Sequence, residues 1–269
     1  MDIGVIMFNG YGVRPGKLGR AVEERGFESL FYPEHTHIPV RSKRADGRPT
    51  RGYAVTYDPF VALAAEAAVT EKIMLGTAVC LVPQRDPFTM AKAVASIDDL
   101  SGGRMLFGVG AGWNREEMAD HGVDPRTRMA RMAEVVKAMK RIWTQDEAEF
   151  HGEFVDFEPV WSWPKPVRPL PVLVGGNGPG TEDRVLDFGD EWLPQCGPLE
   201  TVEELRDRID RLRDRAGRRV PVTLFGVPPK QDLLDQFAGV GVDRCLLSIQ
   251  GEDEAAVLAT LDGLVPLLG

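Results

Sequence analysis

The chain has 269 residues, with 32 Lys and Arg against 41 Asp and Glu, a net charge of −9 and 43% hydrophobic residues. This acidic balance argues against a nucleic-acid partner, which needs basic surface to replace phosphate counterions. The three cysteines, Cys80, Cys196 and Cys245, form no Cys-x-x-Cys pair, which argues against a disulfide framework or a thiolate zinc site. No apolar run approaches the ~18 residues of a membrane span, and the first residues lack the basic stretch of a signal peptide. We therefore expect a soluble cytoplasmic protein with no membrane partner.

Short apolar runs alternate with segments of helical periodicity along the whole chain. The expected strands are Asp2–Phe8, Ser29–Tyr32, Lys72–Val82, Arg104–Gly110, Pro171–Gly176, Glu191–Gln195, Pro221–Gly226 and Arg244–Ile249. The expected helices are Lys17–Arg25, Asp58–Thr70, Pro87–Leu100, Arg115–Trp143 (with an interruption near Gly122–Pro125), Thr181–Phe188, Val202–Ala216, Gln231–Gly239 and Asp253–Leu268. Alternating βα units form a parallel sheet, and this number of units predicts a single α/β domain, a (β/α)8 TIM barrel over residues 1–269.

Two segments fall outside this alternation and are interpreted as insertions. One follows the second strand, covers Ile38–Tyr57, and contains the basic residues Arg41, Lys43, Arg44, Arg48 and Arg51. The other precedes the fifth strand, covers Phe150–Arg168, is rich in Trp, Phe and Pro, and alternates around His151–Gly152 like a hairpin. Insertions in such barrels commonly lie at the carboxyl ends of strands, where active sites form. The basic segment either caps an anionic ligand or is a solvated loop.

The clearest candidate for proton chemistry is Glu34–His35, directly after the second expected strand. Histidine transfers protons near neutral pH, and we expect Glu34 to orient or tune His35. A purely structural His35 is the alternative. His37 adds the option of a metal, but the other histidines lie in helix or hairpin segments, so we predict no metal site.

Two glycine-rich turns follow the fourth and fifth expected strands. Gly108, Gly110 and Gly112 precede one helix, and the turn Gly175–Gly180 precedes another. Glycine lets a flat ligand or a phosphate approach the backbone, and a helix N-terminus attracts anions. A tight βα turn without a ligand is the alternative for each. Trp113 either stacks on a ring or packs, and Glu116–Glu117 is typical of the first turn of a helix.

Taken together, these segments resemble the luciferase-like monooxygenase superfamily, and in particular its coenzyme F420-dependent oxidoreductase branch. The motifs are Glu34–His35, Gly76–Pro83, Pro87 with Ala91–Lys92, Asp98–Arg104, Gly108–Glu117 and Gly175–Thr181. The resemblance covers nearly the whole chain. It implies a TIM barrel that binds FMN or a deazaflavin at the carboxyl ends of its strands. It also implies a homodimer, for which the helix Phe60–Val69 is a candidate interface.

The resemblance assigns roles to individual residues. A non-prolyl cis peptide is expected at Ala78–Val79, under the central flavin ring, and His35 matches a histidine near the reacting edge of that ring. Residues expected to bind the cofactor are Thr77, Ala78, Val79, Gly110, Ala111, Gly112, Trp113, Asn114, Gly175, Gly176, Asn177, Gly178 and Thr181. Trp113 replaces an acid of the family's sugar-phosphate dehydrogenases, which argues against that activity. Ala111 replaces the phosphate-binding arginine of bacterial luciferase.

The predicted function is hydride transfer between coenzyme F420 and a small organic substrate, with Glu34 and His35 as the catalytic residues. An FMN-dependent monooxygenase that uses reduced flavin and oxygen is the nearest alternative. A non-catalytic flavin-binding protein and a metal-dependent barrel hydrolase using His35 and His37 are alternatives of other classes. The aromatic residues Phe154, Trp161 and Trp163 hint at an apolar or flat substrate or at a hydrophobic lid.

Overall fold

The computed structural model describes residues 1–8, 11–44, 46–197 and 201–269. Its central sheet contains the parallel strands β1 (Asp2–Met7), β2 (Ser29–Tyr32), β3 (Met74–Thr77), β5 (Met105–Gly110), β8 (Val172–Gly175), β9 (Glu191–Leu193), β10 (Thr223–Val227) and β11 (Arg244–Ile249). They pair in the order β10-β11-β1-β2-β3-β5-β8-β9. Parallel bridges from Trp192 to Val222 and from Gln195 to Phe225 bring the two ends of this order together. The strands thus form a nearly closed barrel, and the predicted fold is confirmed.

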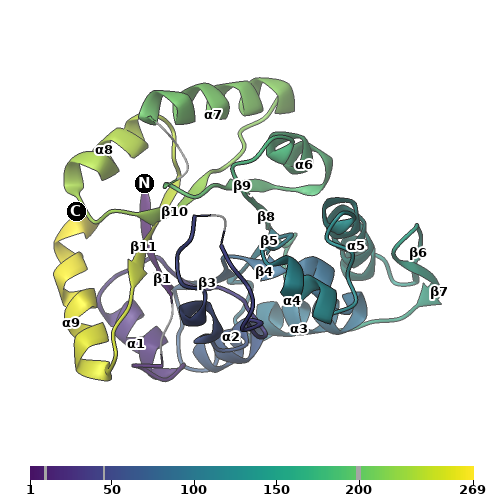
Figure 1. Cartoon of the computed structure of the whole chain (residues 1–269), viewed down its shortest axis with the longest axis horizontal. Coiled ribbons are helices and arrows are strands. Elements are labelled where there is room, and N and C mark those ends of the chain that lie inside the picture. Colours follow the sequence, from purple (N-terminus) through teal and green to yellow (C-terminus); the bar gives the residue numbers. More distant parts are fainter. Residues whose placement is uncertain (9–10, 45, 198–200) are drawn as a thin grey trace.

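Helices follow the strands and surround the sheet (Figure 1). They are α1 (Lys17–Glu24), α2 (Pro59–Ala67), α3 (Pro87–Leu100), α4 (Arg115–Asp120), α5 (Arg128–Thr144), α6 (Thr181–Phe188), α7 (Val202–Ala216), α8 (Gln231–Gly239) and α9 (Glu254–Leu264). The expected cap Asp58 accepts hydrogen bonds from the backbone N–H groups of Phe60 and Val61 at the start of α2. Among the described residues, no helix is long and apolar enough to cross a membrane.

The core has two parts that share the strands. The larger part packs between the outer faces of the strands and the helices. The smaller part fills the inside of the barrel with buried side chains from six strands and from the end of β3: Ile6, Phe31, Ala78, Leu106, Leu173, Leu193 and Leu246. Such an interior is a packed core and not a pore. A ligand therefore cannot bind inside the barrel, and the carboxyl ends of the strands are where TIM barrels build their active sites.

The third strand differs from its prediction. Lys72–Val82 reads as one apolar run, but β3 ends at Thr77, the Ala78–Val79 peptide bond is cis, and the short strand β4 (Cys80–Leu81) then pairs with β5. A 3-10 turn, η2 (Val82–Gln84), follows. The end of β3 cannot be predicted from hydrophobicity, because the residues on both sides of it are apolar. The family resemblance, in contrast, predicts the position of the cis bond correctly.

The two segments outside the alternation lie at opposite ends of the barrel. Residues 33–58 connect β2 to α2 and contain the 3-10 turn η1 (Arg51–Ala54), so they lie at the carboxyl ends of the strands. The predicted hairpin exists as the antiparallel strands β6 (Ala148–His151) and β7 (Asp156–Val160), with its turn after His151. The hairpin follows α5 along the chain and projects beyond that helix, away from the barrel (Figure 1). The segment that contains it connects α5 to β8, and a connection from a helix to a strand reaches the amino end of that strand. The expectation that this segment lines the active site is therefore wrong.

Candidate active site

The ends of the strands surround a pocket of about 310 Å³, which we call the mouth pocket. Its lining consists of Phe8, Pro33, Glu34, His35, Arg44, Tyr53, Thr56, Ala78, Val79, Leu81, Gly110, Ala111, Gly112, Trp113, Met129, Gly175, Gly176, Gln195 and Phe225. These residues follow or end seven strands of the barrel. In TIM barrels this is the end where enzymes carry their catalytic groups. The aromatic residues of the pocket are Phe8, Tyr53, Trp113 and Phe225, and not those of the hairpin segment.

The cis peptide forms part of the pocket wall, and the neighbouring glycines are required by Val79. A Cβ atom on Gly110 would lie 2.4 Å from Cγ2 of Val79, and one on Gly175 would lie 2.7 Å from its Cγ1. No larger residue fits at either position without moving Val79. Three strand ends therefore meet in a compact surface of backbone and one valine side chain, against which a flat ring can lie.

His35 is nearly enclosed, and its hydrogen bonds define the tautomer of its neutral ring. Its side chain is 7% exposed, and its Nδ1 lies 2.7 Å from Oε2 of Glu117. The indole N–H of Trp113 donates to its Nε2 at 3.2 Å. Because an indole nitrogen can only donate, Nε2 accepts this bond, and the ring proton of a neutral His35 lies on Nδ1, toward the carboxylate. The rings of Tyr53 and Trp113 meet His35 edge-on. Nε2 is thus available as a proton acceptor.

Glu117 is a site residue that the sequence interpretation missed. It lies in the first turn of α4, as expected, and its backbone N–H donates to the capping side chain of Asn114 at 3.1 Å. An Asn-x-x-Glu pattern predicts a local cap in which the glutamate returns to the cap backbone. Here the fully buried carboxylate instead accepts from Nδ1 of His35 and from the backbone N–H of Thr36, at 2.7 and 3.0 Å. Only the three-dimensional fold shows this partner.

The expected pairing of Glu34 with His35 is wrong. The buried carboxylate of Glu34 accepts from the backbone N–H of Leu81 at 2.6 Å and from Nε of Arg85 at 2.5 Å. Consecutive residues of an extended chain point in opposite directions, so Glu34 faces the Cys80–Leu81 segment while His35 faces Glu117. Burial alone would lower the pKa of Arg85, but the charge of Glu34 raises it. Glu34 therefore fixes the chain just after the cis peptide.

The expected cofactor-binding residues line three cavities, except for Thr77. Ala78, Val79, Gly110, Ala111, Gly112, Trp113, Gly175 and Gly176 line the mouth pocket. Asn177, Gly178 and Thr181 line a neighbouring groove between the Gly175–Gly180 turn and α7. Thr77 lines neither, because its buried hydroxyl donates to the carbonyl oxygen of Gly108 at 2.6 Å. Asn114 lines a third cavity, described next.

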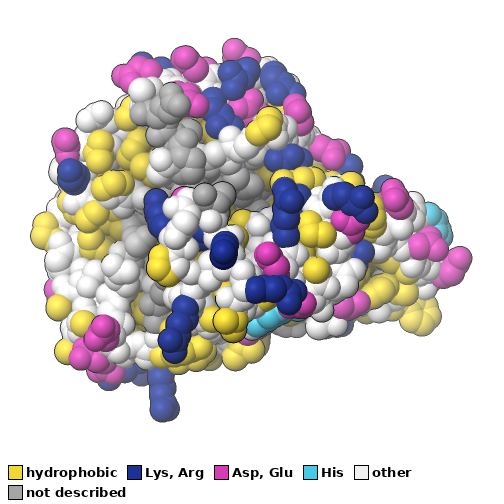
Figure 2. Space-filling model, viewed as in Figure 1, with side chains coloured by type: hydrophobic (Ala, Val, Ile, Leu, Met, Phe, Trp, Pro, Cys, Tyr) yellow, Lys and Arg dark blue, Asp and Glu magenta, His cyan; other side chains and the backbone are white. Residues whose placement is uncertain are grey.

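A cationic basin of about 860 Å³ adjoins the mouth pocket and shares Arg44, Gly112, Trp113 and Gln195 with it. Its basic residues are Lys43, Arg44, Arg115 and Arg128, and its acids are Asp46 and Glu116. The guanidinium of Arg44 lies over the rings of Tyr53 and Trp113, 5.3 and 5.5 Å from their centroids. Figure 2 shows several Lys and Arg side chains across the middle of this face. Of the basic segment, Lys43 and Arg44 line the basin, whereas Arg41, Arg48 and Arg51 do not.

Some of the buried polar atoms without partners lie beside this basin. Within the described ranges, Nδ2 of Asn114 and the Nε atoms of Arg128 and Arg184 are buried and make no hydrogen bond, and the same holds for Oγ of Ser29 and the side-chain amide of Gln84. A guanidinium nitrogen of Arg184 donates to the hydroxyl of Thr181 at 2.9 Å, which places it against the Gly175–Gly180 turn. Burial lowers the pKa of Arg184, Asp183 opposes this, and the positive charge of Arg128 lowers it further. Unsatisfied donors and neighbouring positive charges are the features that an anion would compensate.

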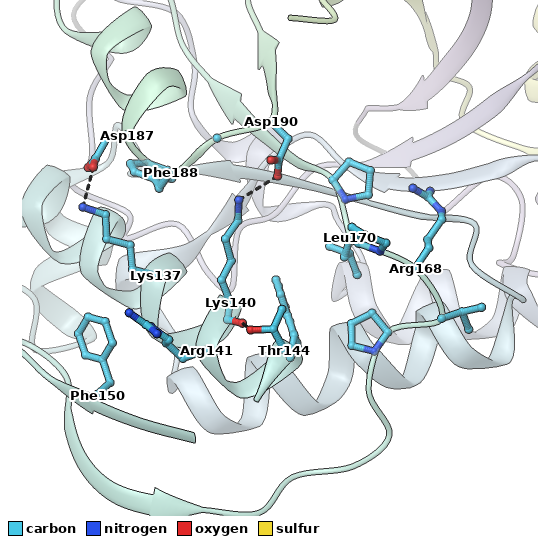
Figure 3. A pocket seen from close by; sticks show the side chains of 16 residues that line it. Lys137, Lys140, Arg141, Thr144, Phe150, Arg168, Leu170, Asp187, Phe188 and Asp190 are labelled. Carbon is cyan, nitrogen blue, oxygen red and sulfur yellow. Dashed lines mark hydrogen bonds and ion pairs between the residues drawn. The ribbon is translucent and has the colours of Figure 1, made fainter. Parts of the chain in front are cut away.

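A larger cavity of about 940 Å³ lies on the side of the barrel, at the amino ends of β8 and β9 (Figure 3). We call it the flank pocket. Its two lysines pair with its two aspartates: Lys137 with Asp187 at 2.7 Å and Lys140 with Asp190 at 2.9 Å. The second pair is anchored further, because Asp190 also accepts from the backbone N–H of Val172. These contacts join α5 to α6 and to the sheet, which is a structural role.

The chain belongs to the luciferase-like monooxygenase family, whose family model matches residues 15–228. An uncharacterized protein of Mycobacterium tuberculosis is 40% identical over 271 residues, which cover 95% of each chain. The F420-dependent glucose-6-phosphate dehydrogenase of Kineococcus radiotolerans is 31% identical over 189 residues, which cover 68% of this chain and 53% of that enzyme. The family and its relatives are those that the sequence motifs resemble.

Solved structures with the same fold include an F420-dependent dehydrogenase and a monooxygenase. An F420-dependent secondary alcohol dehydrogenase in complex with an F420–acetone adduct superimposes with a TM-score of 0.77 at 17% identity, over the full length of both chains. The monooxygenase RslO1 from Streptomyces bottropensis gives a TM-score of 0.83 at 18% identity, over 100% of this chain and 98% of that one. At these identities the likeness concerns the fold alone. The chain is thus an enzyme of the luciferase-like oxidoreductase and monooxygenase family.

Proposed function

We propose that this enzyme transfers a hydride between coenzyme F420 and a small organic substrate bound in the mouth pocket. The F420-dependent relatives support the choice of cofactor. In the sequence, Trp113 stands where the family's sugar-phosphate dehydrogenases have an acid, and the pocket wall is rich in aromatic residues. We therefore propose an apolar or flat alcohol or carbonyl compound as the substrate, and not a sugar phosphate.

The observation that carries this proposal is the set of unsatisfied donors around the cationic basin. FMN ends in a single phosphate, whereas F420 continues beyond its phosphate into an acidic tail. The unpartnered nitrogens of Arg128 and Arg184 fit the phosphate beside the Gly175–Gly180 turn. Lys43 and Arg115 then supply further positive charge at the basin, while Arg44 is already paired with Asp46 at 2.7 Å. One phosphate would not use all these cations, so the longer anion fits the basin better.

The shape of the mouth pocket fits the ring of such a cofactor. Val79, Gly110 and Gly175 form the compact surface against which the ring would lie, and Trp113 stands beside His35 on the pocket wall. When bound, the deazaflavin supplies the carbon that accepts or gives the hydride. The protein then has to position the substrate, exclude water and handle one proton.

In our proposal, His35 is the residue that accepts or donates this proton. Oxidation of an alcohol removes a hydride from carbon and a proton from oxygen, and Nε2 of neutral His35 can take that proton in place of the hydrogen bond from Trp113. The resulting positive charge would be stabilised by the carboxylate of Glu117, which already accepts from Nδ1. In the reverse direction, the same nitrogen returns the proton to a carbonyl oxygen.

Fluorescence titrations with oxidised F420 and with FMN, in parallel, test the choice of cofactor. We expect F420 to bind at least tenfold more tightly than FMN. Arg128→Met and Arg184→Met should each weaken F420 binding about tenfold, a loss of about 1.4 kcal/mol. Lys140→Met in the flank pocket is the matched control and should leave binding unchanged. Tight FMN binding without F420 binding would overturn the proposal and favour a flavin monooxygenase.

A further inference from the structure

A second group of side chains lies on the outer side of the mouth pocket and shares one residue, Glu117, with the proposed reaction. It consists of His37, Glu117 and His121, whose ligand atoms all lie within 4.8 Å of one another. Glu117 and His121 are four residues apart around α4 and so share one face of the helical turn, while His37 lies in the segment after β2. The sequence interpretation kept His121 apart from His37, and the fold brings them together.

The polar atoms of this group converge on one hydroxyl. The hydroxyl of Thr36 lies 2.9 Å from Nδ1 of His37, 2.7 Å from Nε2 of His121 and 3.4 Å from Oε1 of Glu117. A hydroxyl has one proton to donate and lone pairs with which to accept, so it can join two neutral imidazoles only when one of them presents an N–H to it. With a cation in place of this hydroxyl, both imidazoles and the carboxylate could each offer it a lone pair.

The orientation of His37 favours a metal further. Its Nε2 lies 3.2 Å from Oδ2 of Asp120, which can only accept a hydrogen bond when ionised. The N–H is therefore on Nε2, and the lone pair of Nδ1 faces the hydroxyl of Thr36, around which His121 and Glu117 also gather. A carboxylate that holds the far nitrogen of a histidine is the usual support of a metal-binding imidazole. Arg41 contacts the other oxygen of Asp120 at 3.9 Å through a mostly exposed side chain.

We propose that His37, His121 and Glu117 bind a divalent transition-metal ion such as Zn²⁺. Two imidazoles and one carboxylate are a donor set suited to Zn²⁺, whereas Mg²⁺ and Ca²⁺ prefer oxygen ligands alone. The side chain of His37 is 42% exposed, so the ion can reach the site from solvent once the hydroxyl of Thr36 turns aside. The site is independent of the identity of the redox cofactor.

The position of Glu117 couples this site to the mouth pocket. One oxygen of its carboxylate accepts from Nδ1 of His35, and the other accepts from the backbone N–H of Thr36 and lies 3.4 Å from its hydroxyl. An ion bound to the outer oxygen would draw electron density away from the oxygen that His35 contacts, so the hydrogen bond between His35 and Glu117 would weaken. Binding at the outer site is therefore sensed at the ring of His35.

Calorimetric titration of the full-length protein with Zn²⁺, after removal of metals with a chelator, tests the site. We expect one Zn²⁺ per chain and at least a tenfold weaker affinity in His37→Gln and in His121→Gln. His151→Gln is the matched control, because His151 pairs with Asp156 in the hairpin, and it should bind like the wild type. An excess of Mg²⁺ should not compete. Unchanged binding in the His37→Gln or His121→Gln variant, or no binding to the wild type, would overturn the proposal.

The coupling has a separate readout that needs no cofactor. The indole N–H of Trp113 donates to His35, so its NMR signal reports on that ring. Zn²⁺ should shift this signal in the wild type and in His151→Gln, but not in folded His121→Gln. A Zn²⁺ ion that binds without moving the Trp113 signal would contradict the coupling through Glu117. Circular dichroism of each variant would confirm that these exposed substitutions leave the barrel folded.

Discussion

The mouth pocket and the flank pocket differ in size and in how their polar groups are satisfied. The flank pocket, at about 940 Å³, is the larger, and its lysines are paired with aspartates. The mouth pocket, at about 310 Å³, adjoins a basin where buried donors of Asn114 and Arg128 have no partner in the described part of the chain. Lysines paired with aspartates need no ligand to satisfy them, whereas unsatisfied buried donors cost free energy until a ligand binds. Unsatisfied buried donors therefore identify the ligand-binding site better than cavity volume does.

Among substitutions that test the difference between the two pockets, the largest loss of activity is expected at His35. His35→Gln should lower kcat about 100- to 10,000-fold, the range for loss of a general acid–base group, while F420 affinity stays within about twofold. Lys140→Gln in the flank pocket should leave kcat within about twofold. Steady-state rates of F420 reduction, with a substrate that the wild type oxidises, would measure both variants. Equal losses in the two would contradict the assignment of the mouth pocket.

Glu117 gives the next largest effect. Glu117→Gln keeps the shape of the side chain but removes the charge that supports a protonated His35, so we expect kcat to fall about 10- to 100-fold with little change in KM. Glu149 is an exposed residue of the hairpin strand β6, and Glu149→Gln should leave kcat within about twofold. A loss confined to KM would instead assign Glu117 to substrate binding.

Gly110 tests the wall of the mouth pocket. Its added Cβ would lie 2.4 Å from Val79, so Gly110→Ala should displace the wall, destabilise the fold by about 1–3 kcal/mol and weaken F420 binding several-fold. Gly263 in α9 has open space around it, and Gly263→Ala should stabilise the protein by about 0.5–1 kcal/mol. Chemical denaturation with a parallel binding titration separates the two outcomes. An unchanged affinity in folded Gly110→Ala would place the ring elsewhere.

The smallest expected effect is a pH-dependent loss of folding stability at Glu182, in the groove beside α6. Burial alone would raise the pKa of Glu182, but hydrogen bonds from Arg211 and Arg208 lower it overall. A carboxylate with a lowered pKa stabilises the fold above its ordinary value of 4.5, and this contribution disappears as the pH falls through the pKa in the folded state. Glu182→Gln should therefore cost up to about 1 kcal/mol at pH 7. Urea unfolding should show this difference shrink below about pH 4.5, and a difference that grows there would contradict the sign.

Sequence patterns predicted the barrel well because a buried strand or a buried helical face requires hydrophobic residues at regular spacing along the chain. The order of strands, the caps and the hairpin all follow from such local signals. The partners of Glu34 and Glu117 do not, because each depends on a contact between segments far apart along the chain. Glu34 adjoins His35 in sequence and still faces Leu81 and Arg85. His37 and His121 likewise meet only through the packing of α4 against the segment after β2.

A crystal structure with bound F420 tests the central claim most directly. We expect the deazaflavin ring against Val79, with its hydride-accepting carbon on the side of His35 Nε2, the phosphate beside Arg128 and Arg184, and the acidic tail in the cationic basin. The flank pocket should remain without cofactor. A ring bound in the flank pocket, or one in the mouth pocket with its phosphate and tail away from these cations, would contradict the account.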